Sequence, residues 1–152
     1  MPLLQGLTHV VIHHSAGPPS QTFEEIERFH TTPTASGGKG FLAIGYHVVI
    51  LPDGRVRHGR RLPVQGAHAP NPVRKDVPAP SFNATSIGVC LIGDNTVPGR
   101  EWTAEQVLSL RRYLDALDKV APGLTLLGHR DTGKATECPG IDRGKLLSML
   151  GR

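Results

Sequence analysis

The stretch "TSIGVCLIG", residues Thr85–Gly93, begins with two hydroxyl side chains and continues as a run of small and apolar residues. A run of this kind is typical of a strand that is buried on both faces in the middle of a sheet. Cys90 falls inside it, where a free thiol behaves as a small hydrophobic side chain. We therefore expect a sheet to be built outward from this strand.

Three further segments predict the neighbours of this strand. "THVVIHH" (Thr8–His14) is rich in β-branched residues, and "LTLLG" (Leu124–Gly128) is a second short apolar run. "IGYHVVILPDGRVRHGR" (Ile44–Arg60) has a "PDG" turn between two strand-like halves, which predicts a hairpin. Together these segments predict a central mixed β-sheet of about five to six strands.

The segment after Thr22 predicts a helix that flanks this sheet. Thr22 and Glu25, three residues apart, match a capping-box pattern. The apolar residues that follow at helical spacing are Phe23, Ile26 and Phe29. We expect these three side chains to form the face that packs on the sheet.

The clearest helix pattern runs from Thr103 to Val120, and Thr103 and Gln106 form a second capping box. Its apolar stripe comprises Val107, Leu110, Leu114 and Leu117. A short terminal helix, "DRGKLLSML", follows near the end of the chain. The predicted fold class is therefore α/β, with a mixed sheet flanked by helices.

The length and composition predict one compact domain, residues 1–152. The formal net charge is +4 and the isoelectric point is near 9.4, which favours an anionic partner. Lysines and arginines are scattered and aromatic residues make up only 5% of the chain, so we do not expect nucleic acid to be that partner.

The N-terminal residues 1–17 lack the basic start and unbroken apolar core of a signal peptide. No segment approaches the roughly 18 apolar residues of a membrane span. We therefore expect synthesis in the cytoplasm and no insertion into a membrane. No stretch has the pattern of an exposed apolar helix face, so we expect a monomer.

The segment "GHRDTGKATECPG", residues 128–140, places a cysteine close to a histidine among many polar groups. Cys138 follows His129 by nine positions. A cysteine does chemistry as a thiolate, either as a nucleophile beside a base or as a metal ligand. His129 is suited to either arrangement, as the base or as a second ligand.

Two histidines and one cysteine, with a fourth position open, are the ligand set of a catalytic zinc site. The third ligand would be His13 or His14, which end a predicted strand. The alternative is that these histidines are partly buried structural residues and that Cys138 is an ordinary loop thiol. No CxxC or HExxH motif decides between the two interpretations.

Five motifs follow one another along residues 8–150: "VVIHHSAG", "GYHVVILPDGRVRHGR", "GAHAP", "NATSIGVCLIGD", and "GHRD" with "TECPG". In this order and at these distances they resemble the zinc-dependent N-acetylmuramoyl-L-alanine amidases of the type 2 amidase, peptidoglycan-recognition-protein and T7-lysozyme-like superfamily. Each motif alone is a weak signal, whereas five in the family's order are specific. The resemblance implies an α/β domain with zinc in a surface groove.

The resemblance implies that one Zn²⁺ per chain is bound by His13, His129 and Cys138. Cys138 would bind as a thiolate, whose negative charge offsets part of the charge of the metal. His14 stands where family members vary, and strand alternation directs it to the face opposite His13.

Tyr46, in "GYH", corresponds to the tyrosine beside the zinc in family enzymes. With an unperturbed pKa of about 10, a phenol is better suited to donate a hydrogen bond to a developing oxyanion than to act as a base. Thr136 stands two residues before Cys138, where phage-type members have a lysine, and its hydroxyl can donate to the same oxygen. Lys134 is the other candidate for the role of that lysine.

His68, in "GAHAP", and Asn83 match positions that line the substrate groove of relatives. Both belong to a long proline-rich stretch, Leu62–Asn83, and an irregular segment of that length in a compact domain is more often functional than not. The alternative for His68 is a solvated loop histidine.

The implied activity is zinc-dependent hydrolysis of the amide bond between N-acetylmuramic acid and L-alanine of the peptidoglycan stem peptide. The partner is then bacterial peptidoglycan or a muropeptide. The architecture resembles a bacteriolytic endolysin, which acts on the cell wall from the host periplasm after release. The alternative is a muropeptide-binding module without activity, while a cysteine peptidase would leave His13 and Tyr46 unexplained.

Overall fold

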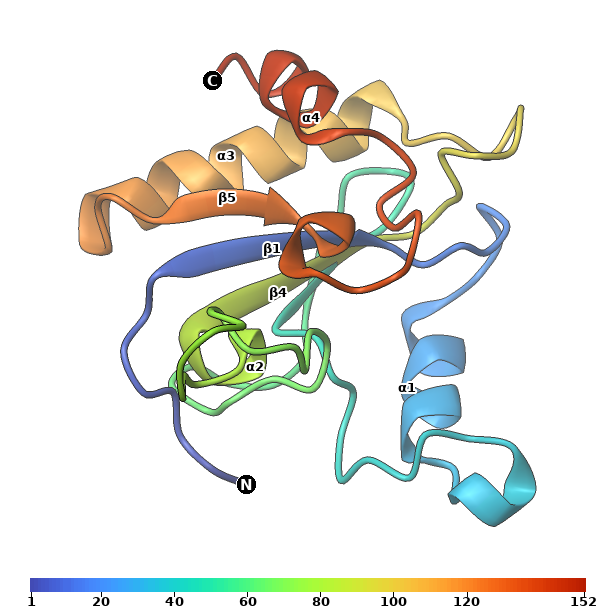
Figure 1. Ribbon diagram of the computed structural model, residues 1–152. Coiled ribbons are helices and arrows are strands. Elements are labelled where there is room, and N and C mark those ends of the chain that lie inside the picture. Colours follow the sequence, from blue (N-terminus) through green and yellow to red (C-terminus); the bar gives the residue numbers. More distant parts are fainter.

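The computed structural model describes residues 1–152 and contains one mixed β-sheet (Figure 1). Its five strands lie in the order β3-β2-β4-β1-β5, so the Thr85–Gly93 stretch supplies the central strand. The predicted mixed sheet and the central place of this stretch are confirmed. The strands are β1 (His9–His14), β2 (Val48–Ile50), β3 (Val56–His58), β4 (Ser86–Leu91) and β5 (Thr125–Gly128).

The strand directions place the ends of β1 and β5 side by side. β1 is parallel to both β4 and β5, and β2 is parallel to β4, whereas β2 and β3 form the predicted antiparallel hairpin. In the β1–β5 ladder the last pair joins Ile12 to Gly128. The next residues along these two segments are His13 and His129, so both histidines reach the same edge of the sheet. Ligands commonly bind at the carboxyl ends of parallel strands, and this edge is such a place.

One face of the sheet packs on helices α3 (Ala104–Val120) and α4 (Arg143–Met149), which lie together in Figure 1. A cluster of 15 buried hydrophobic residues from the sheet and the helices fills this layer. The predicted capping box of Thr103 and Gln106 is confirmed. Neither α3 nor any other helix is long and apolar enough to cross a membrane.

The other face is covered by α1 (Phe23–Thr31), the one-turn helix α2 (Phe82–Thr85) and the irregular segment that precedes α2. Figure 1 shows α1 and α2 away from the α3–α4 pair. Two separate clusters of 6 and 3 buried hydrophobic residues lie here. Buried histidines whose rings contact one another directly or through Tyr46 lie in the same layer, among them His13, His30 and His68.

Helix α1 begins where the sequence predicts, but its buried face differs from the prediction. Phe23 and Ile26 are buried as expected, whereas Phe29 is 49% exposed, so its predicted place in the core is wrong. His30 takes the buried position of that turn, because positions 23, 26 and 30 share one side of a helix. Burial of this imidazole is possible because its Nδ1 accepts the backbone N–H of Gly45 at 2.8 Å.

Candidate metal centre

His13 lies where the buried polar groups of the α1 face converge. Strand alternation turns its side chain away from α3, and the residue is 1% exposed. Its ring centroid lies 4.6 Å from that of His129 and 5.0 Å from those of His68 and Tyr46. His13 is therefore enclosed by rings from three different segments.

His129 and Cys138 come from the segment that follows β5. His129 begins the short 3-10 helix η2 (His129–Thr132), and Asp131 fixes this turn by accepting the backbone N–H of Gly128 at 2.8 Å. A backbone hydrogen bond of 2.7 Å joins η2 to the carbonyl of Cys138. Both residues are thus anchored to the end of a buried strand.

The structure brings the three candidate ligands together. One ligand atom from each of His13, His129 and Cys138 lies within 4.8 Å of the other two. Cys138 Sγ is 3.7 Å from His13 Nδ1. Zinc binds a thiolate sulfur at about 2.3 Å and an imidazole nitrogen at about 2.0–2.1 Å, so these two ligands lie about 3.6 Å apart around a tetrahedral ion. The observed separation therefore fits a shared zinc ion.

A chain of hydrogen bonds leaves Nδ1 of His13 free to bind a metal. The Ser86 hydroxyl donates to the Phe82 carbonyl at 2.6 Å, so its oxygen is left to accept from Nε2 of His68 at 3.4 Å. With its proton on Nε2, His68 accepts at Nδ1 from His13 Nε2–H across 2.9 Å. The lone pair of His13 Nδ1 then faces Cys138, as a metal ligand requires.

Burial sets the charge states of these ligands. It lowers the pKa of His13 well below its ordinary value and that of His129 to about 4, with Lys134 as a further cause at His129. Both imidazoles are therefore neutral at neutral pH. Burial also raises the pKa of Cys138 to about 12, so a thiolate there needs a bound cation. Nε2 of His129 is buried without a hydrogen-bond partner. Together these features fit a zinc site.

The candidate ligands lie in the wall of a cavity of about 350 Å³, which Tyr46 also lines. The Tyr46 ring contacts those of His13 and His30, with centroid distances of 5.0 and 5.3 Å. Burial, followed by the influence of Cys90 and Cys138, raises the pKa of Tyr46 well above its ordinary value. The phenol is therefore protonated at neutral pH and can donate a hydrogen bond.

Lys134 lines this cavity, whereas Thr136 is not among the lining residues. The Thr136 hydroxyl oxygen accepts the backbone N–H of Cys138 at 3.2 Å. The structure thus places the ammonium group on the cavity side and uses the threonine to support the cysteine loop.

His68 and Asn83 both line the cavity, and they are coupled. Asn83 Oδ1 accepts the backbone N–H groups of His68 and Ala69, each at 2.7 Å. The amide therefore fixes the loop that holds His68 against His13. The His13–His68 contact has no sequence signature, because the two residues lie 55 positions apart.

The lining residues that the sequence analysis does not single out include Lys39 and Phe41. They stand in "GGKGF", a glycine-rich stretch shortly before "GYH". A cation close to an aromatic residue in such a stretch is the pattern that could have marked them as candidate site residues. No carboxylate lines the cavity, and neither Lys39 nor Lys134 forms an ion pair. The cavity therefore presents uncompensated positive charge.

Residues 4–141 match the protein family described as N-acetylmuramoyl-L-alanine amidase. The chain therefore belongs to this family, and the resemblance predicted from the five motifs is confirmed. It is 34% identical over 148 residues to peptidoglycan-recognition protein SC2 of Drosophila melanogaster, which covers 90% of this chain and 70% of that protein. It is 33% identical over 138 residues to the endolysin of Enterobacteria phage T3, covering 88% of this chain and 80% of the endolysin.

Solved structures show the same fold. The Ph2119 endolysin from a Thermus scotoductus bacteriophage matches with a TM-score of 0.74 and 29% identity, covering 97% of this chain and 87% of that one. A mutant of Drosophila PGRP-LB in complex with tracheal cytotoxin matches with a TM-score of 0.75 and 27% identity, covering 96% and 83%. The relatives of this chain thus include both endolysins and peptidoglycan-recognition proteins.

Proposed function

We propose that this chain is a zinc-dependent amidase that hydrolyses the amide bond between N-acetylmuramic acid and L-alanine of the peptidoglycan stem peptide. One observation carries the proposal: His13, His129 and Cys138 converge at a zinc-compatible separation beside a protonated Tyr46 in one cavity. Membership of the amidase family and the similarity to endolysins support the same reaction.

The three ligands would hold the zinc ion at the wall of the cavity. When bound, zinc supplies a Lewis acid for the scissile carbonyl and lowers the pKa of a water molecule toward about 7. His68 keeps the proton of His13 on Nε2, so that Nδ1 stays directed at the metal position. The loop of Asn83 and the Ser86 hydroxyl hold His68 in turn.

Tyr46 and Lys134 are the residues that stabilise the oxyanion in this proposal. The Tyr46 phenol keeps its proton and donates a hydrogen bond to the substrate carbonyl oxygen as negative charge develops there. The Lys134 ammonium contributes positive charge from the cavity wall. Thr136 acts behind them by fixing the backbone of Cys138.

The charge of the cavity agrees with a peptidoglycan substrate. Stem peptides carry carboxylates, and a cavity with Lys39 and Lys134 but no acidic residue attracts such groups. The similarity to endolysins supports synthesis in the cytoplasm and action on the cell wall as a bacteriolytic enzyme. In this proposal the chain acts as one catalytic domain and as a monomer.

The test is mass spectrometry of purified peptidoglycan after incubation with the protein. We expect stem peptides with a free L-alanine amino terminus beside uncut glycan strands, released with zinc and not with a chelator. Cys138→Ser should lose both zinc and activity, whereas Cys90→Ala, which changes the other cysteine, should keep zinc. Release by Cys138→Ser at the rate of the unmodified protein would contradict the assigned zinc ligand.

The same experiment distinguishes this proposal from a second candidate, a muropeptide-binding module without activity. The similarity to a peptidoglycan-recognition protein solved with tracheal cytotoxin favours this alternative. A binding module would hold zinc and retain muropeptides without releasing any stem peptide.

A further inference from the structure

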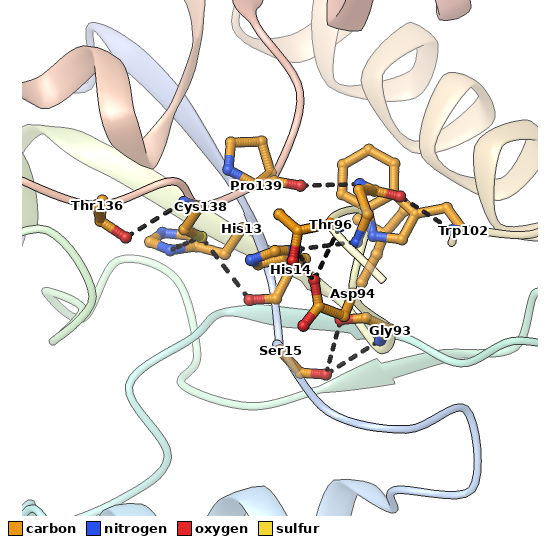
Figure 2. A network of polar contacts seen from close by, with 12 residues as sticks. His13, His14, Ser15, Gly93, Asp94, Thr96, Trp102, Thr136, Cys138 and Pro139 are labelled. Atoms are coloured by element: carbon orange, nitrogen blue, oxygen red, sulfur yellow. Dashed lines mark hydrogen bonds and ion pairs between the residues drawn. The ribbon is translucent and has the colours of Figure 1, made fainter. Parts of the chain in front are cut away.

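Asn95 lies in the connection between β4 and α3 and joins three segments. Its backbone N–H donates to His14 Nδ1 at 3.2 Å, and its side-chain Nδ2 donates to the Pro139 carbonyl at 2.8 Å. Its Oδ1 accepts the backbone N–H of Trp102 at 3.1 Å. Figure 2 shows His14, Trp102 and Pro139 gathered in this network. A carbonyl on one side and an N–H on the other fix the orientation of the amide.

Asn95 is closely packed against the backbone of Gly140. Gly140 has a φ of +81°, a conformation that favours glycine. A Cβ added there would lie 2.9 Å from Cβ of Asn95 and 3.0 Å from Cε1 of His14. The backbone after Cys138 therefore reaches Asn95 and His14 only because residue 140 has no side chain.

These contacts stand next to two of the candidate zinc ligands. His14 directly follows His13, and Pro139 directly follows Cys138. The backbone of Cys138 bonds only within the segment that follows β5. Its carbonyl accepts the N–H of Arg130, and its N–H donates to the hydroxyl oxygen of Thr136. Asn95 therefore joins the cysteine loop to the end of β1: its side chain bonds the Pro139 carbonyl, and its backbone N–H bonds His14.

We propose that Asn95 is a positioning residue of the metal centre, which holds Cys138 Sγ at bonding geometry to the ion that His13 binds. The inference rests on the proposed function, because it requires the zinc centre. Sγ lies 3.7 Å from both His13 Nδ1 and the His14 carbonyl, so a small shift of the loop changes the sulfur–nitrogen separation directly. Partners of this kind typically change metal affinity by about 10- to 100-fold when they are removed.

Asn95→Asp separates this role from a structural one. Aspartate can still accept the N–H of Trp102, but an ionised carboxylate cannot donate to the Pro139 carbonyl. Its added negative charge would by itself favour a cation, so weaker zinc binding cannot be an effect of charge. Asn95→Ala removes both side-chain bonds. Thr96→Ala is the matched control, because the neighbouring Thr96 side chain bonds only Asp94.

The measurement is the zinc dissociation constant of each purified protein, by competition with a chelating dye, together with urea unfolding of the zinc-free forms. Substitution with cobalt reports the thiolate bond through its sulfur-to-metal absorption band. We expect Asn95→Asp and Asn95→Ala to weaken zinc binding by about 10- to 100-fold and to diminish the cobalt–thiolate band. Thr96→Ala should match the unmodified protein.

Two results would overturn the inference in distinguishable ways. Folded Asn95→Asp that binds zinc and cobalt like the unmodified protein would refute the positioning role while the zinc centre stands. Failure of the unmodified protein itself to bind zinc would remove the centre, and with it the proposed amidase. If Asn95→Ala does not fold, Asn95→Asp supplies the comparison, because it keeps the bond to Trp102.

Discussion

The two faces of the sheet differ in what they bury. The α3–α4 face holds a single cluster of 15 hydrophobic residues, and its buried amide, Gln106, donates to the carbonyls of Ile50 and Ile92. The α1 face holds two clusters of 6 and 3 residues and a set of buried histidines. The first face has the continuous packing of a stable core, whereas the second has smaller apolar clusters with polar side chains buried between them. Changes on the first face should therefore act on stability and changes on the second on function.

The largest effect on stability is expected from Leu110→Ala on the α3 face. Leu110 is 1% exposed, and removal of a buried leucine side chain costs about 2–5 kcal/mol of the free energy of unfolding. Urea unfolding measures this loss, and the zinc affinity of the folded fraction should not change. Leu108→Ala on the same helix is the control, because Leu108 is 45% exposed and should change stability by no more than about 0.5 kcal/mol. A loss of zinc affinity in Leu110→Ala would show that the two faces are not independent.

The next effect is on catalysis and separates two residues of the cysteine segment. Lys134→Gln should lower kcat about 100-fold, or about 2.7 kcal/mol, because it removes positive charge from the cavity wall. Thr136→Val should lower kcat less and act through zinc affinity, because its hydroxyl supports Cys138. Lys119→Gln, on α3, is the control for the loss of one charge. A larger drop in kcat for zinc-loaded Thr136→Val than for Lys134→Gln would assign the oxyanion role to the threonine.

Local patterns predict much of the fold. The run of Thr85–Gly93 marks the central strand because a continuous run of small and apolar residues is typical of a strand covered on both faces. The capping box of Thr103 and Gln106 marks the start of α3 because its bonds join residues three apart. The five ordered motifs also select His13, His129 and Cys138, which the parallel ends of β1 and β5 then bring together.

What the sequence does not reveal depends on contacts between distant segments. Phe29 and His30 are neighbours, and the burial of His30 instead of Phe29 depends on the Gly45 N–H, a partner 15 positions away that satisfies the buried imidazole. Similarly, no pattern shows that Lys134 faces the cavity while Thr136 faces the backbone, since the path of an irregular loop is set by tertiary hydrogen bonds. The joining of His14 to Pro139 by Asn95 is of the same kind.

The pH dependence of stability should reveal a buried histidine of the α1 face. Burial, followed by Lys39 and Arg60, lowers the pKa of His30 to about 4, and Tyr46 packs against its ring. In the unfolded chain His30 has its ordinary pKa of about 6.5 and binds a proton below that pH, whereas in the folded protein it binds the proton only near pH 4. The contribution of His30 is therefore complete above pH 6.5, is lost as pH falls from 6.5 to 4, and is constant below that.

His30→Gln isolates this effect, because glutamine can still accept the Gly45 N–H but does not titrate. Urea unfolding of zinc-free protein between pH 7.5 and 4 should show a loss that is smaller by about 2 kcal/mol in the variant than in the unmodified protein. The comparison cancels the other buried histidines, which are present in both. Parallel pH curves for the two proteins would mean that His30 binds its proton over the same pH range in the folded and the unfolded state, which would contradict the lowered pKa.

The smallest effect sharpens the comparison of the faces at their helix caps. Thr22 caps α1 through one hydrogen bond from the Glu25 N–H, so Thr22→Ala should cost about 1 kcal/mol or less. Because α1 packs on a cluster of only 6 residues, the loss should appear as faster hydrogen exchange within α1 and leave α3 protected. Thr103→Ala, at the capping box of α3, should instead lower protection across the whole sheet, because α3 covers the continuous core. If Thr22→Ala speeds exchange in α3 as well, α1 unfolds together with that core. The helix that carries His30 would then belong to the same cooperative unit as α3 and would not open independently beside the site.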